Sequence, residues 1–246
     1  MTARSVVART AAVVACTVAV AGCTTTIPGA AHTLQSGPPA SSSPSEPQSG
    51  DGPSNGFIAP NALGATLLKR GDLAAAVDGA DLRPIQTYDK PDFSTSMQPQ
   101  QCDFRAFPAR STAYLSPLLE GMAGDANSDD QTGLLAAQVV SAWSTVDHPK
   151  MVLSKFKSEW RLCPEGQGFT AFTPEKSTPW MSGPVTDSSE QRAVSLITRQ
   201  EPPAKTCAHL ITIHLNAVIE TLVCGPGDTV AQAGVIADGV VSNLGA

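Results

Sequence analysis

Cysteines and histidines are the side chains of this sequence best suited to chemistry. The 246 residues include six cysteines and four histidines. A cysteine can accept a lipid, form a disulfide or bind zinc, and a histidine beside a carboxylate can transfer protons or hold a ligand. The sequence has no G-x-S-x-G, H-E-x-x-H, Walker or G-x-G-x-x-G motif that would assign these groups to an enzyme. We therefore expect no enzyme activity, no bound metal and no cofactor.

Cys23 ends a segment that is typical of an exported lipoprotein. Basic residues precede an apolar stretch at residues 11–21, which is too short to span a bilayer and therefore indicates a signal peptide at residues 1–22. The segment closes with Val20-Ala21-Gly22-Cys23, which resembles the bacterial lipobox, where the cysteine receives a diacylglyceryl group. The alternative is an ordinary secretory peptide with a chance cysteine. We expect lipid attachment at Cys23, which makes the membrane a partner and anchors the protein at the outer face of the cell membrane.

Residues 24–56 have the composition of a tether. Of these 33 residues, 22 are Pro, Gly, Ser or Thr, and none is Lys, Arg or aromatic. Such a segment buries too little apolar surface to offset the entropy of ordering, so a disordered tether is predicted after the lipidated cysteine. It would hold a folded domain, residues 57–246, some tens of ångströms from the membrane. No later stretch is apolar and long enough for a transmembrane helix.

The charge balance argues against nucleic acid as a partner. The formal net charge is −6, and removal of two arginines with the signal peptide leaves 14 basic against 22 acidic residues, or −8. There is no run of basic residues. A net acidic chain of this kind lacks the electrostatic attraction to phosphate on which nucleic-acid binding depends.

Four cysteines remain in the predicted folded domain: Cys102, Cys163, Cys207 and Cys224. An even number in an exported chain predicts disulfides. Zinc would require close ligand pairs such as C-x₂-C, whereas the spacings here are 61, 44 and 17 residues. We expect two disulfides and no metal.

A predicted hairpin selects the pairing of the cysteines. Residues 207–214 and 217–224 are both rich in Ile, Val, Thr and Leu, which favour strands, and Leu215-Asn216 separates them. A two-residue turn there places Cys207 directly opposite Cys224, at a separation that a disulfide can bridge. Cys102–Cys163 follows by elimination.

The remaining pattern predicts an α+β fold. Val152, Phe156 and Trp160 recur at helical spacing after Asp147, and a second amphipathic helix follows Thr229. Two short helices are expected within residues 62–77. Candidate strands lie at residues 82–88, 134–143, 169–173, 180–185 and 191–199, before the hairpin. Strands grouped between helices predict an antiparallel β-sheet with helices packed on one face.

Four side chains are candidates for a ligand cleft beside this sheet. The hairpin register points His209 and Glu220 to the same face as diagonal neighbours, where a carboxylate could orient an imidazole. A polar pair on the exposed face of the sheet is the simpler interpretation. Trp143 ends one strand and Trp180 begins another, so either could line a cleft mouth, although a core position is the simpler expectation.

Several motifs occur in an order that resembles one family. Trp160-Arg161-Leu162-Cys163, Trp180-Met181-Ser182-Gly183-Pro184-Val185 and Cys207…Asn216…Cys224 are followed by the closing helix. This order resembles the extracellular sensor domain of the mycobacterial receptor kinase PknH and the lipoproteins that share that domain. The resemblance covers roughly residues 63–244. It implies an α+β domain, two disulfides that match the pairing above, and a broad cleft beside the sheet that binds a ligand.

Three functional hypotheses follow. The first is an envelope lipoprotein whose non-catalytic, sensor-like domain binds an unknown envelope ligand or partner protein through a sheet-side cleft. The second is a structural or protein-interaction module of the envelope without a small ligand. The third is a hydrolase with an unrecognised site, which would need a Ser or Asp within hydrogen-bond reach of His209.

Overall fold

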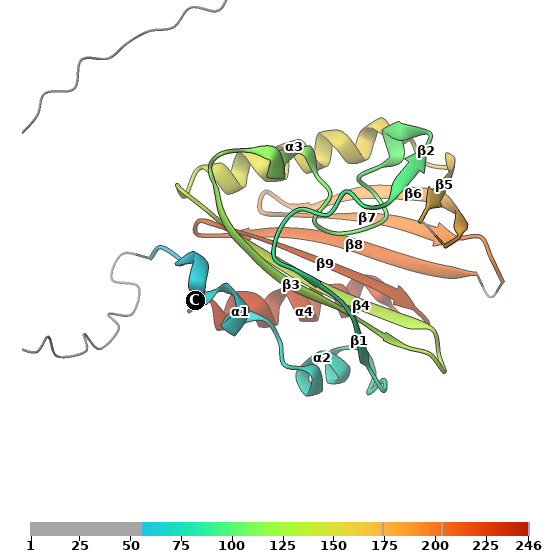
Figure 1. Cartoon of the computed structure of the whole chain (residues 1–246), viewed down its shortest axis with the longest axis horizontal. Coiled ribbons are helices and arrows are strands. Elements are labelled where there is room, and N and C mark those ends of the chain that lie inside the picture. Colours follow the sequence, from blue (N-terminus) through green and yellow to red (C-terminus); the bar gives the residue numbers. More distant parts are fainter. Residues whose placement is uncertain (1–55, 174, 203, 246) are drawn as a thin grey trace, which may run out of the picture. The chain divides into compact units, whose positions relative to one another are not determined.

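The computed structural model describes residues 56–173, 175–202 and 204–245 of the chain (Figure 1). The predicted signal peptide (residues 1–22), Cys23 and nearly all of the predicted tether lie outside these ranges. None of the helices within them is both long and apolar enough to cross a membrane.

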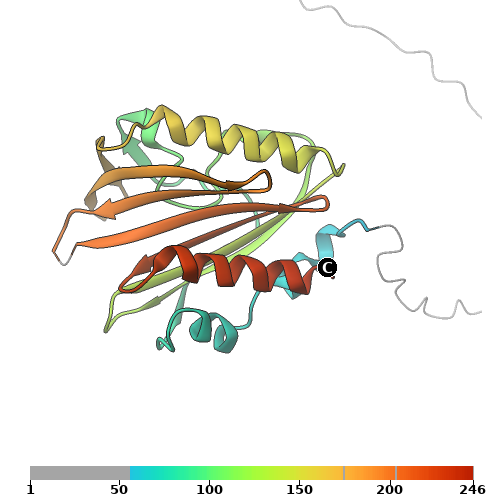
Figure 2. The same ribbon diagram turned by 180° about the vertical axis from the view of Figure 1, so that it is seen from behind.

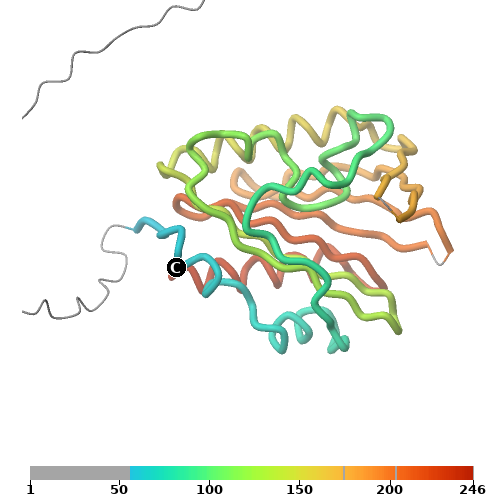
Figure 3. Tube along the Cα trace, viewed as in Figure 1, coloured from blue at the N-terminus to red at the C-terminus, as the bar shows by residue number. Residues whose placement is uncertain are grey.

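A nine-stranded antiparallel sheet forms the body of the domain, in the order β1-β3-β4-β9-β8-β7-β6-β5-β2. The strands are β1 (Arg83–Tyr88), β2 (Ser96–Gln98), β3 (Leu119–Asp129), β4 (Leu134–Trp143), β5 (Gly168–Phe172), β6 (Ser177–Ser189), β7 (Arg192–Arg199), β8 (Lys205–His214) and β9 (Ala217–Gly225). Figure 3 shows that the sheet twists strongly from β1 to β2. The α+β class predicted from the sequence is confirmed.

Helices cover both faces of the sheet, whereas the sequence predicted helices on one face. On one face lies α3 (His148–Leu162); on the other lies α4 (Thr229–Asn243), as Figure 2 shows from behind. The short helices α1 (Leu63–Thr66) and α2 (Arg70–Ala76) accompany α4. The physical reason is the composition of β8 and β9, whose residues are apolar or buried on both faces, so neither face can be left to solvent.

Alternation along β8 shows how its two faces differ. Cys207 and Ile211 belong to the core beneath α3, which includes Phe156 and Trp160. Ala208 and Leu210 belong to the core beneath α4, which includes Ile236 and Val240. Successive side chains of a strand point to opposite faces, so one strand contributes to two separate cores.

A long connection between β2 and β3 lies on the α3 face of the sheet. It contains two short 3₁₀-helices, η2 (Gln100–Cys102) and η3 (Thr112–Leu115), and a third, η1 (Pro60–Ala62), precedes α1. The Trp160 indole donates a hydrogen bond to the Phe104 carbonyl at 2.9 Å, and the Ala109 N–H donates to a Glu220 carboxylate oxygen at 3.0 Å. The connection is therefore held between α3 and the sheet.

Both predicted disulfides are confirmed. Cys207 and Cys224 are cross-strand partners in β8 and β9 and are bonded, at a sequence separation of 17. The second disulfide, Cys102–Cys163, joins η2 to the residue that follows α3. One bond thus closes the hairpin and the other fastens the long connection to the end of α3.

The two edges of the sheet are irregular. The β1 edge contains Pro84, and its register with β3 shifts between Pro84 and Gln86. The opposite edge, β2, is only three residues long. Proline, a bulge and a short strand each reduce the ability of an edge to pair with another chain.

Candidate functional site

An open pocket lies at the end of the sheet where β8 begins and β9 ends. Its volume is about 260 Å³, and we call it the disulfide pocket because the Cys207–Cys224 bond forms part of its wall. Its apolar wall is completed by Phe107, Leu135, Ala171 and Trp180.

Trp180 holds a central place in this wall. It lies on β6, with its ring stacked on Phe169 of the neighbouring strand β5 at a centroid distance of 6.4 Å. The ring also meets Phe107 edge-on at 6.3 Å. Aromatic partners on two sides fix the orientation of the indole, so the pocket wall is preorganised.

Three cationic side chains line the same pocket: Lys176, Arg199 and Lys205. Arg199 also pairs with Glu201, and the Lys205 Nζ atom donates to the Gly133 carbonyl at 2.6 Å. No carboxylate is among the described residues that line the pocket. Positive charge beside an apolar wall in a net acidic chain favours a ligand that carries an anionic group.

His209 and Glu220, which the register predicted as diagonal neighbours, are in direct contact away from this pocket. The Nε2 atom of His209 lies 2.8 Å from Oε2 of Glu220, and both side chains are 0% exposed. The His209 ring lies beneath α3, with its centroid 5.0 Å from that of Trp160. The pair is therefore sealed between the sheet and the helix and does not reach solvent.

Every polar atom of this pair has a partner. The His209 Nδ1 atom faces the Arg105 carbonyl oxygen at 3.2 Å, and the other Glu220 oxygen accepts from the Ala109 N–H and the Tyr114 hydroxyl. Both ring nitrogens thus face oxygen atoms of the protein, so neither is available to an external molecule. Burial, together with the charge of Glu220, raises the pKa of the Tyr114 hydroxyl, which therefore remains a donor.

Trp143 lies at the opposite end of the sheet from the disulfide pocket. Its ring is buried, stacks on Tyr114 at 6.0 Å, and its Nε1 donates to the Ser141 hydroxyl at 3.1 Å. His148 stacks on its other side. Of the four side chains predicted for a ligand cleft, the structure places only Trp180 in the disulfide pocket.

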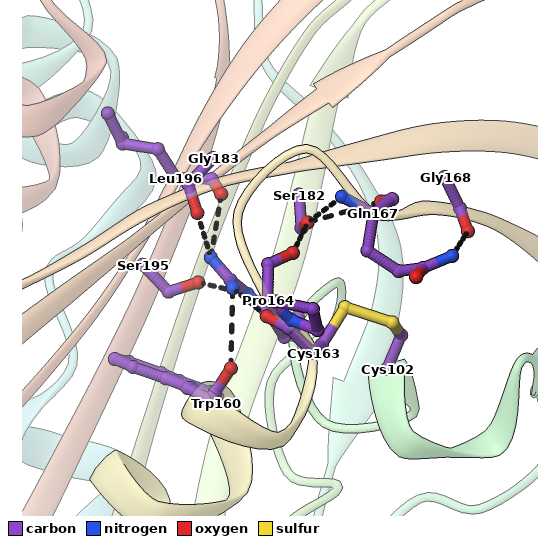
Figure 4. Close-up of a disulfide and its surroundings, with 11 residues drawn as sticks. Cys102, Trp160, Cys163, Pro164, Gln167, Gly168, Ser182, Gly183, Ser195 and Leu196 are labelled. Carbon is purple, nitrogen blue, oxygen red and sulfur yellow. Dashed lines mark hydrogen bonds between the residues drawn. A yellow bond between two sulfur atoms is a disulfide. The ribbon is translucent and has the colours of Figure 1, made fainter.

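Arg105 is a buried residue that the sequence analysis did not identify. Its guanidinium donates to the Ser195 hydroxyl and to the carbonyls of Trp160, Cys163, Gly183 and Leu196. Figure 4 labels these five acceptors beside the Cys102–Cys163 disulfide. These acceptors belong to the end of α3 and to the β6–β7 pair where its register shifts. Burial lowers the pKa of Arg105 to about 10, which leaves it cationic at neutral pH.

A second buried carboxylate holds the same connection to α3. Glu159 accepts from the Ser111 hydroxyl at 2.7 Å and from the backbone N–H and hydroxyl of Thr112. Together, Arg105, Glu159 and Glu220 hold the connection between β2 and β3 at three points. Their arrangement serves the positioning of Phe107 and the pocket wall.

Two sequence signals could have drawn attention to the missed residues. Arg105 is the one charged residue within Phe104–Ala109, an otherwise apolar stretch, and such an isolated charge often marks a buried, fully bonded group. Arg199 and Lys205 flank the short connection before Cys207. Cations next to a predicted disulfide strand could have been assigned to the same end of the sheet.

The fold and the site define a class of protein: a disulfide-fastened α+β domain with a sealed polar interior and one apolar pocket bordered by cations. Residues 58–243 match the model of the PknH-like extracellular domain family, and the chain belongs to that family. Membership implies an extracytoplasmic location for the domain. The resemblance noted in the sequence is thereby confirmed.

A solved structure of the family agrees at the level of the fold. The crystal structure of the extracellular domain of PknH from Mycobacterium tuberculosis is similar with a TM-score of 0.69 and 21% identity, covering 76% of this chain and 97% of that chain. A putative uncharacterized protein from Mycobacterium smegmatis gives a TM-score of 0.32 and 9% identity, covering 71% and 96%. That second likeness is too weak to carry an argument. A search of curated proteins finds no match.

Proposed function

We propose that this protein is a membrane-anchored envelope lipoprotein whose non-catalytic, sensor-like domain binds an apolar molecule that carries an anionic group. The disulfide pocket is the observation that carries this proposal. Its walls of Trp180, Phe107 and the Cys207–Cys224 disulfide offer an apolar group a preformed surface. Its two lysines, Lys176 and Lys205, offer a carboxylate or phosphate a counter-charge.

The His209–Glu220 pair supports binding over catalysis. A hydrolase would need a nucleophile beside His209, and both ring nitrogens are already occupied by Glu220 and a backbone carbonyl. Ser195 is the cross-strand partner of His209, but its hydroxyl accepts a hydrogen bond from the Arg105 Nε at 2.9 Å. The histidine is thus a structural group in this proposal.

The pocket's contents can be probed with decanoate, which combines an alkyl chain with a carboxylate, and with 1-decanol, which lacks the charge. Calorimetric titration of the mature chain should detect decanoate binding that is tighter than binding of decanol. Lys176→Glu should weaken decanoate binding, because it replaces an exposed cation of the pocket with a negative charge that repels the carboxylate of the probe. Lys90→Glu makes the same charge change at an exposed position outside the pocket and is the matched control.

Trp180→Phe tests the apolar wall in the same assay. It keeps an aromatic ring against Phe107 and Phe169 but removes contact area, so it should weaken the binding of both probes. Equal affinity of the wild type for decanoate and decanol would show that the pocket does not select an anionic group. Absence of binding by either probe would favour the interaction-module hypothesis.

The anchor is tested by Cys23→Ala in the native host. The wild type should be found in the membrane fraction and be extracted from it by detergent. The variant should be released from the membrane or should fail to mature, because no acyl chain can attach. A variant that partitions as the wild type does would exclude lipidation at Cys23 as the anchor.

A further inference from the structure

Large apolar side chains are exposed together at the end of the domain opposite the disulfide pocket. We call this set the apolar rim: Phe57, Leu115, Leu118, Val146, Met151 and Leu215. We propose that the apolar rim docks on the surface of the lipid bilayer. The inference rests on the proposed lipid anchor and adds to it an orientation of the domain.

Hydrogen bonds join neighbouring segments that carry the rim residues. The Ser144 N–H donates to the Leu118 carbonyl at 3.1 Å, which joins the end of β4 to the start of β3. The Trp143 N–H donates to the Asn216 carbonyl at 2.9 Å, and the Ile58 N–H donates to the Asn216 side chain at 2.8 Å. Figures 1 and 2 agree that these segments and the start of α3 lie at one end of the domain.

The rim contains half of the large apolar side chains that are exposed in the described part of the chain. Six of the twelve large apolar side chains that are exposed within the described residues belong to it, and Leu115 and Met151 are 68% and 58% exposed. Single exposed apolar residues are ordinary on protein surfaces. A set of six at one end, on segments far apart in the sequence, marks an interaction surface.

Leu215 adds an independent observation. It occupies the tight β8–β9 turn with φ of 52°, a backbone region that favours Gly, Asn or Asp, and its side chain is exposed. A leucine suits neither this turn nor contact with water. Its position fits a side chain that is used at an apolar surface.

The direction of the chain identifies the bilayer as the occupant. The described chain begins at Gly56, and Phe57 and Ile58 lie beside Asn216 in the rim itself. The predicted anchor, Cys23, is 33 residues upstream. The predicted tether allows the domain to extend some tens of ångströms from the membrane, but it joins the domain at the rim. It therefore keeps this end at a high effective concentration near the lipid, so a weak intrinsic affinity is sufficient for docking.

Docking by the rim would point the disulfide pocket away from the bilayer. Leu135, at the pocket, is the second residue of β4, and Trp143, beside the rim, is its last, eight positions further on. At the usual rise of a strand, this separation is roughly 25 Å. The pocket would then open toward the outer envelope, with the domain's length between it and the lipid.

The test uses the full acylated chain with a single added cysteine that carries an environment-sensitive fluorophore. Met151→Cys places the label in the rim, and Val235→Cys places it on the outer face of α4 at nearly equal exposure, 58% against 56%. The chain is reconstituted in vesicles of phosphatidylethanolamine and phosphatidylglycerol that contain a brominated phosphatidylcholine. We expect a blue shift and quenching of the label at residue 151, and neither at residue 235.

A second variant keeps the test decisive. Leu115→Ser with Leu215→Asn removes apolar surface at two exposed positions. Asparagine also suits the turn better than leucine does, so the double variant should stay folded. The label at residue 151 should then lose its blue shift and quenching, although the chain still floats with the vesicles. Equal signals from residues 151 and 235 would overturn the proposal. A blue shift at residue 151 in the absence of vesicles would also overturn it, because a second copy of the chain, and not lipid, would then cover the rim. A chain that does not float with the vesicles at all would instead refute the anchor.

Discussion

The Nε2 atom of His209 and the Oε2 atom of Glu220 lie 2.8 Å apart at a point where neither side chain is exposed to solvent. The two residues project from neighbouring strands, and α3 and the connection between β2 and β3 close over them. An imidazole and a carboxylate placed in this way cannot act on an external molecule without opening the domain. Their effect is on the free energy of unfolding.

Replacement of Glu220 by alanine should therefore reduce stability sharply. The change leaves the His209 ring, the Tyr114 hydroxyl and the Ala109 N–H without their acceptor in the interior. Breaking a buried pair by removal of one partner costs about 3–5 kcal/mol. Urea unfolding measures the loss, with the exposed Glu190→Ala as control. An unchanged urea midpoint for Glu220→Ala would contradict the buried geometry.

Arg105 should be as sensitive as the buried pair. Arg105→Met keeps much of the side-chain length but removes all five hydrogen bonds. Each buried acceptor that is left without a partner lowers the free energy of unfolding by about 1–3 kcal/mol. Arg105→Lys should restore little, because an ammonium cannot reproduce the planar fork.

The control for Arg105 is Arg161→Met. Arg161 pairs with Asp187 at the surface, where ion pairs contribute about 0–1 kcal/mol. Thermal unfolding of the three variants should order them Arg161→Met, Arg105→Lys and Arg105→Met, from most to least stable. If Arg105→Lys matches the wild type, the multiple carbonyl contacts are not what stabilises the domain.

The two disulfides should differ in what they support. Chain entropy predicts a loss of about 3 kcal/mol for removal of the 17-residue link and about 4 kcal/mol for the 61-residue link. The Cys207→Ala, Cys224→Ala double variant should also weaken decanoate binding, since it removes part of the pocket wall. The Cys102→Ala, Cys163→Ala variant should affect stability more than binding. Non-reducing peptide mapping of the wild type verifies both links, and a peptide joining Cys163 to Cys207 would exclude this pairing.

Asp125 should give stability a defined pH dependence. Burial raises its pKa, although hydrogen bonds from Gln138 and Asn127 oppose the effect. The folded chain therefore holds this proton more tightly than the unfolded chain, and the contribution of Asp125 to stability falls as pH rises through its folded pKa. Asp125→Asn should be more stable than the wild type at neutral pH.

That gain should disappear in acid, where the wild-type carboxyl is also protonated. Urea unfolding at about pH 3 and about pH 7 measures the difference, and the exposed Asp130→Asn should change stability by less than about 0.5 kcal/mol. A constant gain at both pH values would show that the effect is not linked to the proton on Asp125.

The sequence predicted the hairpin and the two long helices well, for a local reason. Strand-forming residues on both sides of a two-residue turn fixed the register of Cys207 and Cys224, and helical spacing marked α3 and α4. These signals involve neighbours in the chain. The position of Trp180 on a strand near the hairpin could be anticipated for the same reason.

Strand β3 was not predicted, because its composition is small and polar. It contains Gly121 and Gly124, which ordinarily indicate a break in a strand. At Gly124 a Cβ atom would lie 2.5 Å from the Gln138 carbonyl oxygen of β4, so close packing of the two strands requires glycine. Only the tertiary contact explains the residue.

The cover over His209 and Glu220 was also beyond local reasoning. The register indicated that the two side chains share a face, but the residues that seal them, Arg105, Ala109 and Tyr114, come from a connection about a hundred residues earlier. That connection has neither helical nor strand periodicity. Its path depends on Arg105 and on the Cys102–Cys163 link, which act across the whole domain.

The irregular edges of the sheet have a further consequence under the proposed lipid anchor, which would hold many copies of the domain on one membrane surface. Lipid-anchored molecules are confined to two dimensions, where collisions between copies are far more frequent than in the same volume of solution. A sheet that ended in long, straight edges would be a template for strand-to-strand polymerisation under such crowding. On one edge, Pro84 and the adjacent register shift interrupt β1, and on the other edge β2 is only three residues long. Neither edge therefore offers a long strand with which another copy could pair. Under the proposed lipid anchor, these edges would keep the domain from joining neighbouring copies strand to strand.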